Sequence, residues 1–190
     1  MEQDTVMSIR VLPQQSQVLV VDIQEKLAPH LHNEQVMVGR AAQVLEAAKL
    51  FSIPFTVAEQ YPKGLGKTVE AIAAYIREPV FEKTTFSCFG SKALCARVEE
   101  LANAQRNTLI VIGCEAHVCV LQSVIDALDL GYNVVVVDDA VGSRYPRDKE
   151  LAQARLGHAG AQYLSTEMLL FEWTQGKQNE HFKAISSLIK

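Results

Sequence analysis

The sequence predicts an α/β fold of three layers, in which a doubly wound, six-stranded parallel sheet carries helices on both faces. Short apolar runs alternate with longer segments of helical periodicity along the chain, which is the pattern of βαβ units. The strongest run, residues 108–112, is continuously apolar, as expected for a strand buried on both faces. No change of composition divides the chain, so residues 1–190 are predicted to form one domain, with an N-terminal arm at 1–15 and a C-terminal tail or helix at 176–190.

The first part of the chain predicts two strands around one helix. A strand is expected at 17–22, where an apolar run ends in an acid, Asp22. Residues 36–51 have apolar side chains at helical spacing, so we expect a helix with one buried face. A short strand follows at 53–57, and the stretch 59–68, with its glycines and proline, is predicted to be a loop.

Three weaker elements come next. Residues 69–76 predict a short helix, and residues 79–82 predict a short strand that leads into Lys83. Residues 91–102 predict a longer helix, because their apolar residues fall on one side of a helical projection. This order continues the alternation of strand and helix toward the most informative part of the chain.

The central element is a strand, a tight turn and a helix. The strand 108–112 is predicted to end at Gly113, and apolar residues then recur at helical spacing up to Leu130. Cys119 falls near the first turn of this helix, where free backbone N–H groups and the helix dipole favour an anion and therefore a thiolate. Burial as a small core residue is the alternative for this cysteine.

The last part of the chain completes the sheet. Strands are predicted at 133–139 and 162–164, with a helix at 148–160 between them. Ser165 is a suitable N-cap for the next helix, and residues 178–190 predict a final helix or a tail.

Composition limits the possible functions. The chain is 48% hydrophobic and 21% charged with a formal net charge of -4, which argues against nucleic acid as the main partner. No apolar run reaches the ~20 residues of a membrane span, so no membrane partner is expected. The first residues lack the pattern of a signal peptide, and the four cysteines suit reduced thiols, so we expect a cytoplasmic protein, with a mitochondrial location left open.

Three reactive residues follow predicted strands: Asp22, Lys83 and Cys119. The carboxyl ends of parallel strands share one edge of the sheet, where open α/β folds bind ligands. Taken singly, Lys83 suits a solvated surface and Asp22 suits a strand end with backbone hydrogen bonds. Their convergence with a thiol predicts a nucleophilic site.

Two other patterns in the sequence bear on nucleotide binding and metal binding. Residues 64–68 resemble the end of a phosphate-binding loop, but the complete motif requires glycine at position 61, where Tyr61 stands. The five histidines form no metal-binding pair on a helix, and no Cys/His set has zinc spacing. We therefore expect no bound nucleotide and no catalytic metal.

Four motifs occur together in the order and spacing of one known family. They are VLVVDIQ at 18–24, KTTFSCF at 83–89, GCEAHVCV at 113–120 and DDAVGSR at 138–144. In these motifs the chain resembles the isochorismatase-like cysteine hydrolases over about residues 15–175. The stretches 59–66 and 115–119 look most like the isochorismatase domain-containing branch of that superfamily.

The resemblance implies a Rossmann-like, six-stranded parallel sheet and a catalytic triad. Carried over by motif, Cys119 is the nucleophile, Asp22 the base and Lys83 the cation. The family also implies a cis peptide between Cys114 and Glu115, which directs the N–H groups of Glu115 and Cys119 at one point as an oxyanion hole. Nicotinamidases of this superfamily hold a metal through an Asp and His cluster after the second strand. Residues 58–63 contain no histidine, so we expect neither a metal nor another cofactor.

The leading hypothesis is a cysteine hydrolase that cleaves a small amide-like substrate through a thioester on Cys119. From loop position alone, the substrate pocket is predicted to include Tyr61, Phe86, Phe89 and His117. Three alternatives remain open: hydrolysis of a vinyl ether of the isochorismatase type, a non-enzymatic oligomeric partner protein, and a thiol redox protein pairing Cys119 with Cys114. The family implies a homo-oligomer, either dimer or tetramer, with a small molecule as the other partner.

Overall fold

A computed structural model describes residues 10–190 and contains one six-stranded sheet. Every pair of neighbouring strands is parallel, and the spatial order is β3-β2-β1-β4-β5-β6. The strands are β1 (Ser16–Val21), β2 (Phe55–Gln60), β3 (Phe81–Lys83), β4 (Thr108–Cys114), β5 (Asn133–Gly142) and β6 (Gln162–Leu164). Residues 1–9 of the predicted N-terminal arm lie outside the described part of the chain.

Helices of very different lengths connect the strands. The α-helices are α1 (Glu34–Leu50), α2 (Pro62–Leu65), α3 (Glu70–Ala73), α4 (Lys92–Asn103), α5 (Leu121–Asp129), α6 (Pro146–His158), α7 (Thr166–Thr174) and α8 (Phe182–Leu188). Three short 3₁₀ turns, η1 (Pro13–Gln15), η2 (Ala28–His30) and η3 (Cys88–Gly90), and one π-helical turn, η4 (Ala116–Val120), complete the path.

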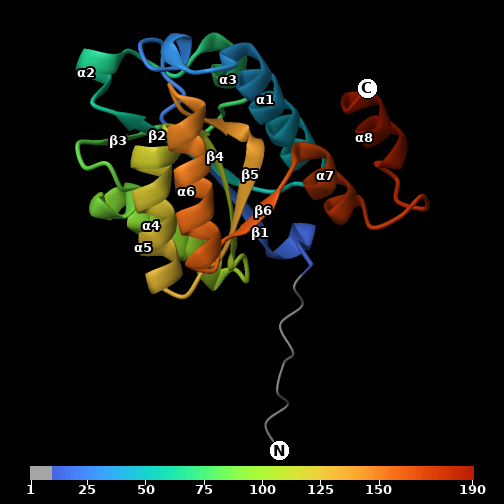
Figure 1. Ribbon diagram of the computed structural model, residues 1–190. Helices are drawn as coiled ribbons and strands as arrows, with labels where there is room; N and C mark the ends of the chain where they lie inside the picture. Colours follow the sequence, from blue (N-terminus) through green and yellow to red (C-terminus); the bar gives the residue numbers. More distant parts are fainter. Residues whose placement is uncertain (1–9) are drawn as a thin grey trace, which may run out of the picture.

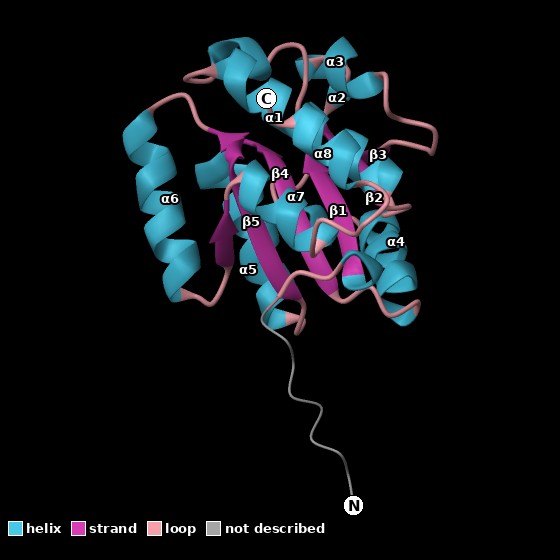
Figure 2. Cartoon of the chain, turned by 90° about the vertical axis from the view of Figure 1, so that its right-hand side faces the viewer, coloured by secondary structure: helices cyan, strands magenta, loops and turns pink. Residues whose placement is uncertain are grey.

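The sheet is covered on both faces. Helices α4, α5 and α6 lie on one side (Figure 1), and α1, α7 and α8 lie on the other (Figure 2). The predicted α/β fold with a doubly wound sheet is therefore confirmed. The strand order reverses between β1 and β4, and at such a switch point the carboxyl ends of the strands form a ligand-binding crevice.

Two apolar layers hold the sheet between its helices. The layer under α1, α7 and α8 is centred on Trp173, which is fully buried and whose indole N–H donates to Ser16 Oγ at 3.1 Å. The layer under α4, α5 and α6 includes Leu94, Val124 and Leu156. Burial on both sides explains the continuous apolar runs in the central strands, at residues 18–21 of β1, 109–112 of β4 and 134–137 of β5.

Two predictions about local structure were wrong. The strand β4 does not end at Gly113 but continues to Cys114, because β1 approaches so closely that a Cβ on Gly113 would lie 2.0 Å from the Val21 carbonyl oxygen. The predicted loop 59–68 begins inside β2 and contains α2. Polar side chains at the end of β2 are buried by specific hydrogen bonds, which polarity alone does not indicate.

The C-terminal part follows the predicted order more closely. Ser165 is the N-cap of α7, and its hydroxyl accepts a hydrogen bond from the Met168 N–H at 3.2 Å. The segment predicted as a tail or helix contains α8. Within residues 10–190, no helix combines the length and the hydropathy needed to cross a bilayer.

Candidate active site

Asp22 is fixed at the carboxyl end of β1 by its backbone. Its φ of 50° lies in the left-handed region, which aspartate tolerates better than most residues. Its N–H donates to the Ala58 carbonyl at 3.2 Å, and its carbonyl accepts from the Gln24 N–H at 2.8 Å and from the Cys114 thiol at 3.0 Å. The turn ends the strand and places the carboxylate in a fully buried position.

Lys83 ends the short edge strand β3 and forms a buried ion pair with Asp22. The distance from Lys83 Nζ to Asp22 Oδ2 is 2.7 Å, and both side chains are 0% exposed. The ammonium also donates to Gln60 Oε1 at 2.7 Å and to the carbonyls of Phe86 at 2.9 Å and Thr85 at 3.2 Å. Every proton of the ammonium therefore has an acceptor, which a buried lysine requires.

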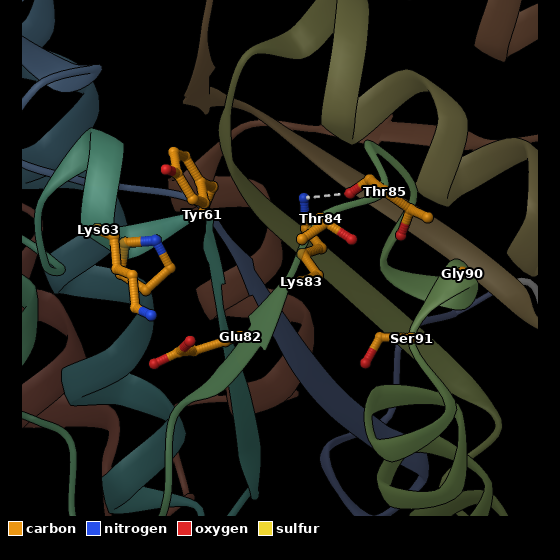
Figure 3. A pocket seen from close by; sticks show the side chains of 9 residues that line it. Tyr61, Lys63, Glu82, Lys83, Thr84, Thr85, Gly90 and Ser91 are labelled. Atoms are coloured by element: carbon orange, nitrogen blue, oxygen red, sulfur yellow. Dashed lines mark hydrogen bonds between the residues drawn. The ribbon is translucent and has the colours of Figure 1, made fainter.

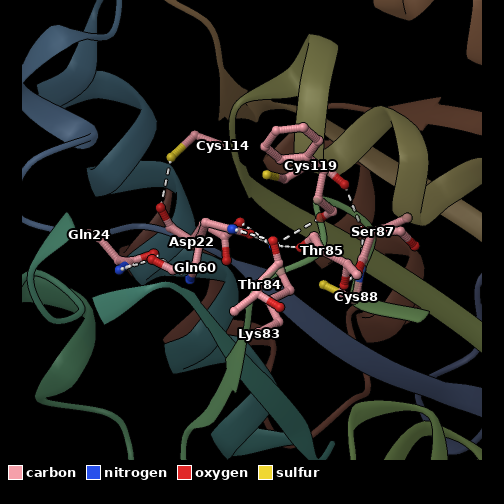
Figure 4. A network of polar contacts seen from close by, with 12 residues as sticks. Asp22, Gln24, Gln60, Lys83, Thr84, Thr85, Ser87, Cys88, Cys114 and Cys119 are labelled. Atoms are coloured by element: carbon pink, nitrogen blue, oxygen red, sulfur yellow. Dashed lines mark hydrogen bonds and ion pairs between the residues drawn. The ribbon is translucent and has the colours of Figure 1, made fainter. Parts of the chain in front are cut away.

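Cys119 reaches the same place from the turn after β4. A cis peptide joins Cys114 and Glu115, as the family resemblance implies, and the π-helical turn η4 then carries Cys119 into α5. The Ser123 hydroxyl donates to the Cys119 carbonyl at 2.6 Å and accepts from the Cys88 N–H at 2.9 Å. Figure 4 shows Asp22, Lys83 and Cys119 together with the neighbouring Cys88 and Cys114.

The charges of the three groups are coupled. Burial raises the pKa of Asp22, while the Lys83 ammonium opposes that shift. Burial and the nearby Asp22 carboxylate raise the pKa of the Cys119 thiol, and Lys83 again opposes. Desolvation and the adjacent anion thus oppose the thiolate that the start of the helix favours. The cluster is a buried Asp22–Lys83 ion pair beside the Cys119 thiol.

One polar atom at the cluster is left without a partner. Asp22 Oδ1 is buried and makes no hydrogen bond to any residue in 10–190. The Glu115 carbonyl, next to the cis peptide, accepts from the N–H groups of Val118 and Val120. A free carboxylate oxygen is the feature that a proton transfer requires.

The four predicted pocket residues are dispersed. The Phe86 carbonyl binds Lys83, and its side chain is 52% exposed. His117 Nδ1 lies 3.0 Å from Ser143 Oγ. The Phe89 ring packs against Tyr132 with ring centroids 6.0 Å apart, on the α4 and α5 side of the sheet. Tyr61 is 55% exposed after β2.

A cavity of about 380 Å³ lies beside the edge strand β3 (Figure 3). Its walls include Tyr61 and Lys63 on one side and Thr85 and Ser91 on the other, and Lys83 lines it between them. Neither Asp22 nor Cys119 lines this cavity, so of the triad it borders Lys83 alone.

Sequence reasoning missed Gln60 and Ser123, and it quoted Gln24 in a motif without giving it a role. Gln60 contacts the Lys83 ammonium directly, Gln24 holds the backbone of Gln60, and Ser123 ties the nucleophile turn to the loop after Lys83. Each is a buried, uncharged polar residue, and such burial is costly without partners. Their neighbours in the sequence include other polar residues, so the sequence carries no clear signal that these three are buried.

The remaining thiols and possible metal ligands are arranged differently. All four cysteines are free. Burial raises the pKa of Cys88 to about 12 and raises that of Cys114 as well. The Cys119 pKa is raised too, so what distinguishes Cys119 is its side-chain interaction with the Asp22 carboxylate. Within residues 10–190, no three side chains of His, Cys, Asp or Glu are grouped so that they could hold a metal ion.

Fold and site together define an α/β protein with a buried Asp–Lys pair and a cysteine at the switch point of its sheet. The chain belongs to the isochorismatase domain family, whose family model matches residues 16–168. Bovine isochorismatase domain-containing protein 2 is 37% identical over 182 residues, covering 95% of this chain and 86% of the relative. The resemblance in the four motifs is thereby confirmed, and the chain is a member of the isochorismatase-like hydrolases.

Solved structures agree with this assignment. The structure described as MAR1 ribonuclease from Caenorhabditis elegans has a TM-score of 0.86 and 37% identity, covering 95% of this chain and 92% of that one. The YcaC gene product of Escherichia coli, described as an octameric hydrolase of unknown specificity, has a TM-score of 0.88 over 96% of this chain and 90% of that one. Its identity is 21%, so it supports the fold alone.

Proposed function

We propose that this protein is a cysteine hydrolase that cleaves a small amide-like substrate through a thioester on Cys119, with Asp22 as base and Lys83 as cation. One observation carries the proposal. Lys83 holds one oxygen of the buried Asp22 carboxylate at 2.7 Å, and the other oxygen has no partner within residues 10–190. The Cys119 thiol interacts with the same carboxylate. A carboxylate placed in this way can accept the thiol proton.

The first half of the reaction forms the thioester. The Cys119 Sγ–H proton passes to Asp22 Oδ1 as sulfur attacks the substrate carbonyl carbon, giving a tetrahedral oxyanion. Asp22 then gives that proton to the leaving nitrogen, the C–N bond breaks, and an amine or ammonia departs. Lys83 stays charged throughout and stabilises the negative charge, whether it resides on sulfur or on the carboxylate.

The second half of the reaction restores the enzyme. Asp22 accepts a proton from water as the water oxygen attacks the thioester carbon, and the C–S bond of the second tetrahedral intermediate then breaks. The proton returns to the sulfur, and the carboxylic acid product leaves. No redox partner and no cofactor are needed, because each proton and electron pair is accounted for by Cys119, Asp22 and water.

The oxyanion is proposed to bind between the N–H groups of Glu115 and Cys119. The turn η4 supports this role, because it places Glu115 and Cys119 within one short segment at the carboxyl end of β4. A donor of this kind contributes about 3 kcal/mol to the transition state in related acyl-transfer chemistry.

The buried position of the cluster favours small substrates. Cys119 is 6% exposed, so a bulky or polymeric substrate could not reach its sulfur without rearrangement. Phe86 and His117 remain candidates for the substrate pocket, together with Tyr61 and Phe89. We further propose a cytoplasmic homo-oligomer, a dimer or tetramer, without nucleic acid or membrane partners.

Other activities make different demands on the site. Vinyl ether hydrolysis of the isochorismatase type does not require a thiol, and a non-enzymatic partner protein requires none of the three groups. The ribonuclease description of the nematode relative concerns a polyanionic substrate, which suits neither a net charge of -4 nor a buried cysteine. The arrangement of Asp22, Lys83 and Cys119 therefore favours acyl chemistry.

The test compares Cys119→Ala with Cys95→Ala and the unchanged protein. Cys95 is partly buried and its thiol donates to the Phe89 carbonyl, so its removal is a matched loss of one thiol away from the triad. A panel of small primary amides, p-nitrophenyl esters, isochorismate and a short RNA is offered to each protein. We expect Cys119→Ala alone to lose amide and ester turnover, by at least ~10³-fold. In the unchanged protein and in Cys95→Ala, mass spectrometry should show an acyl adduct on Cys119. Amide turnover retained by Cys119→Ala would refute the proposal, and activity confined to isochorismate or RNA would replace it.

A further inference from the structure

Gln60 connects the Lys83 side chain to the backbone beside it. It is the last residue of β2, and its amide is used at both ends. Its Oε1 accepts from Lys83 Nζ at 2.7 Å, and its Nε2 donates to the Thr84 carbonyl at 2.9 Å. A single buried side chain thus holds both the ammonium and the chain that carries it.

Gln24 in turn holds Gln60. The Gln60 N–H donates to Gln24 Oε1 at 2.7 Å, and Gln24 Nε2 donates to the Gln60 carbonyl at 3.0 Å and to the Gly66 carbonyl at 2.7 Å. Gln24 is fully buried and lies two residues after Asp22 (Figure 4). The segment 64–68, which resembles part of a phosphate loop in sequence, is therefore an outer support of this network, with Gly66 as its contact.

The charge of the groups around Lys83 is as informative as their geometry. Within residues 10–190 the ammonium has four acceptors, and Asp22 alone among them is an anion. The other three are the Gln60 amide and the carbonyls of Thr85 and Phe86, which are neutral. A glutamate at position 60 would have nearly the same shape but would put a second anion against Lys83.

We propose that Gln60 is a positioning residue of the hydrolase, supported by Gln24, and that its neutral amide directs the Lys83 charge to Asp22 and Cys119. The proposal rests on the proposed function, because it concerns how the triad is held. A purely structural glutamine would affect the free energy of unfolding alone. A positioning glutamine also affects the pH at which Cys119 reacts.

The experiment measures the rate of Cys119 alkylation by iodoacetamide between pH 6 and 10, peptide by peptide, in a mass spectrometer. The variants are Gln60→Met, which removes both hydrogen bonds at similar volume, Gln60→Glu, which keeps the shape and adds a charge, and Lys83→Met. Gln43→Met is the matched control, since Gln43 also uses both ends of its amide, accepting from Arg40 at 2.9 Å and donating to the Leu188 carbonyl at 2.7 Å, far from the triad in sequence. Circular dichroism confirms that each variant is folded at the temperature used.

We expect Gln60→Glu to slow Cys119 alkylation about tenfold at a fixed pH, which corresponds to a rise of about one unit in the Cys119 pKa. Gln60→Met should slow the alkylation by less, and Gln43→Met should not change it. If Lys83→Met slows alkylation while both Gln60 variants match the unchanged protein, the role of Gln60 is refuted and the triad stands. If Lys83→Met itself leaves the profile unchanged, Lys83 does not act on Cys119 and the proposed function fails.

Discussion

The two halves of the candidate site are built in opposite ways. On the side of β1, β2 and β3, a closed network saturates the polar groups: Lys83 has four acceptors, and both ends of Gln60 and Gln24 are used. On the side of β4 and α5, the Cys119 thiol interacts with the Asp22 carboxylate, whose Oδ1 has no hydrogen-bond partner within residues 10–190.

The two sides of the site therefore differ in role. The β1–β3 side stabilises buried charges, because each ion there depends on its hydrogen-bond and charge partners. The β4–α5 side keeps a polar group available for the reaction. Changes on the β1–β3 side should therefore alter stability and pKa values, and changes on the β4–α5 side should alter turnover.

The largest effect on stability is expected from Lys83→Met. It leaves the Asp22 carboxylate buried without a cation, which should lower the free energy of unfolding by about 3–5 kcal/mol at neutral pH. The Lys83 charge is the strongest of the effects that lower the Asp22 pKa, so this pKa rises further above its unfolded value when Lys83 is removed. Folding then takes up a proton, and the variant should regain stability as the pH falls through the raised pKa.

Urea unfolding at pH 5 and pH 8 measures both parts of this prediction. Lys149→Met is the control, because Lys149 pairs with Asp138 at 3.5 Å in a partly exposed position and should contribute about 1 kcal/mol or less. Equal losses for the two lysine variants would contradict the view that the β1–β3 half is held by a buried charge pair.

A smaller loss is expected from Gly113→Ala, which tests the junction between the two halves. The Gly113 φ of 123° disfavours any side chain, and the new Cβ would meet the Val21 backbone. Strain and overpacking together should cost about 2–4 kcal/mol. Gly157→Ala is the matched control, since nothing lies within 4 Å of its added Cβ and alanine favours a helix interior by about 0.5–1 kcal/mol. The melting temperatures of the two variants should shift in opposite directions. A shift in the same direction would contradict the close approach of Gly113 to the Val21 backbone as the reason for a glycine there.

The smallest loss is expected from Ser123→Ala on the β4–α5 side. The hydroxyl is fully buried and makes two hydrogen bonds, to Cys119 and Cys88, so its removal should cost about 1–2 kcal/mol. Ser187→Ala, at an exposed position of α8, should change stability by less than about 0.5 kcal/mol. Because Ser123 orients the Cys119 turn, turnover should fall more than stability suggests; unchanged turnover would show that this contact is structural only.

The parallel, doubly wound sheet and the meeting of Asp22 with Lys83 follow from features that the sequence displays. Parallel strands buried on both faces contain continuous apolar runs, and their carboxyl ends lie at one edge of the sheet. The sequence therefore predicted that residues directly after these strands lie close together. The family motifs added the roles of these residues and the cis peptide between Cys114 and Glu115.

The sequence was less informative about Gln24, Gln60 and Gly113. A buried glutamine looks like a solvated one until its partners are known, and those of Gln60 lie on separate segments of the chain. Gly113 was interpreted as a strand end because glycine usually interrupts a strand, whereas here it allows two strands to approach. The sequence likewise did not show the burial and the nearby Asp22 charge that raise the Cys119 pKa, because both depend on the three-dimensional arrangement.

The most direct test of the central claim is the pH profile of Cys119 alkylation in Asp22→Asn. Asparagine keeps the shape and tolerates the left-handed backbone, but it removes the anion that raises the Cys119 pKa and leaves Lys83, which lowers it. The account predicts that Cys119 in this variant reacts with iodoacetamide at least about tenfold faster at pH 7, while amide turnover is lost and Cys95 in the same sample is unchanged. If Cys119 alkylation at pH 7 is as slow as in the unchanged protein, or slower, Asp22 is not coupled to the thiol and the triad must be abandoned.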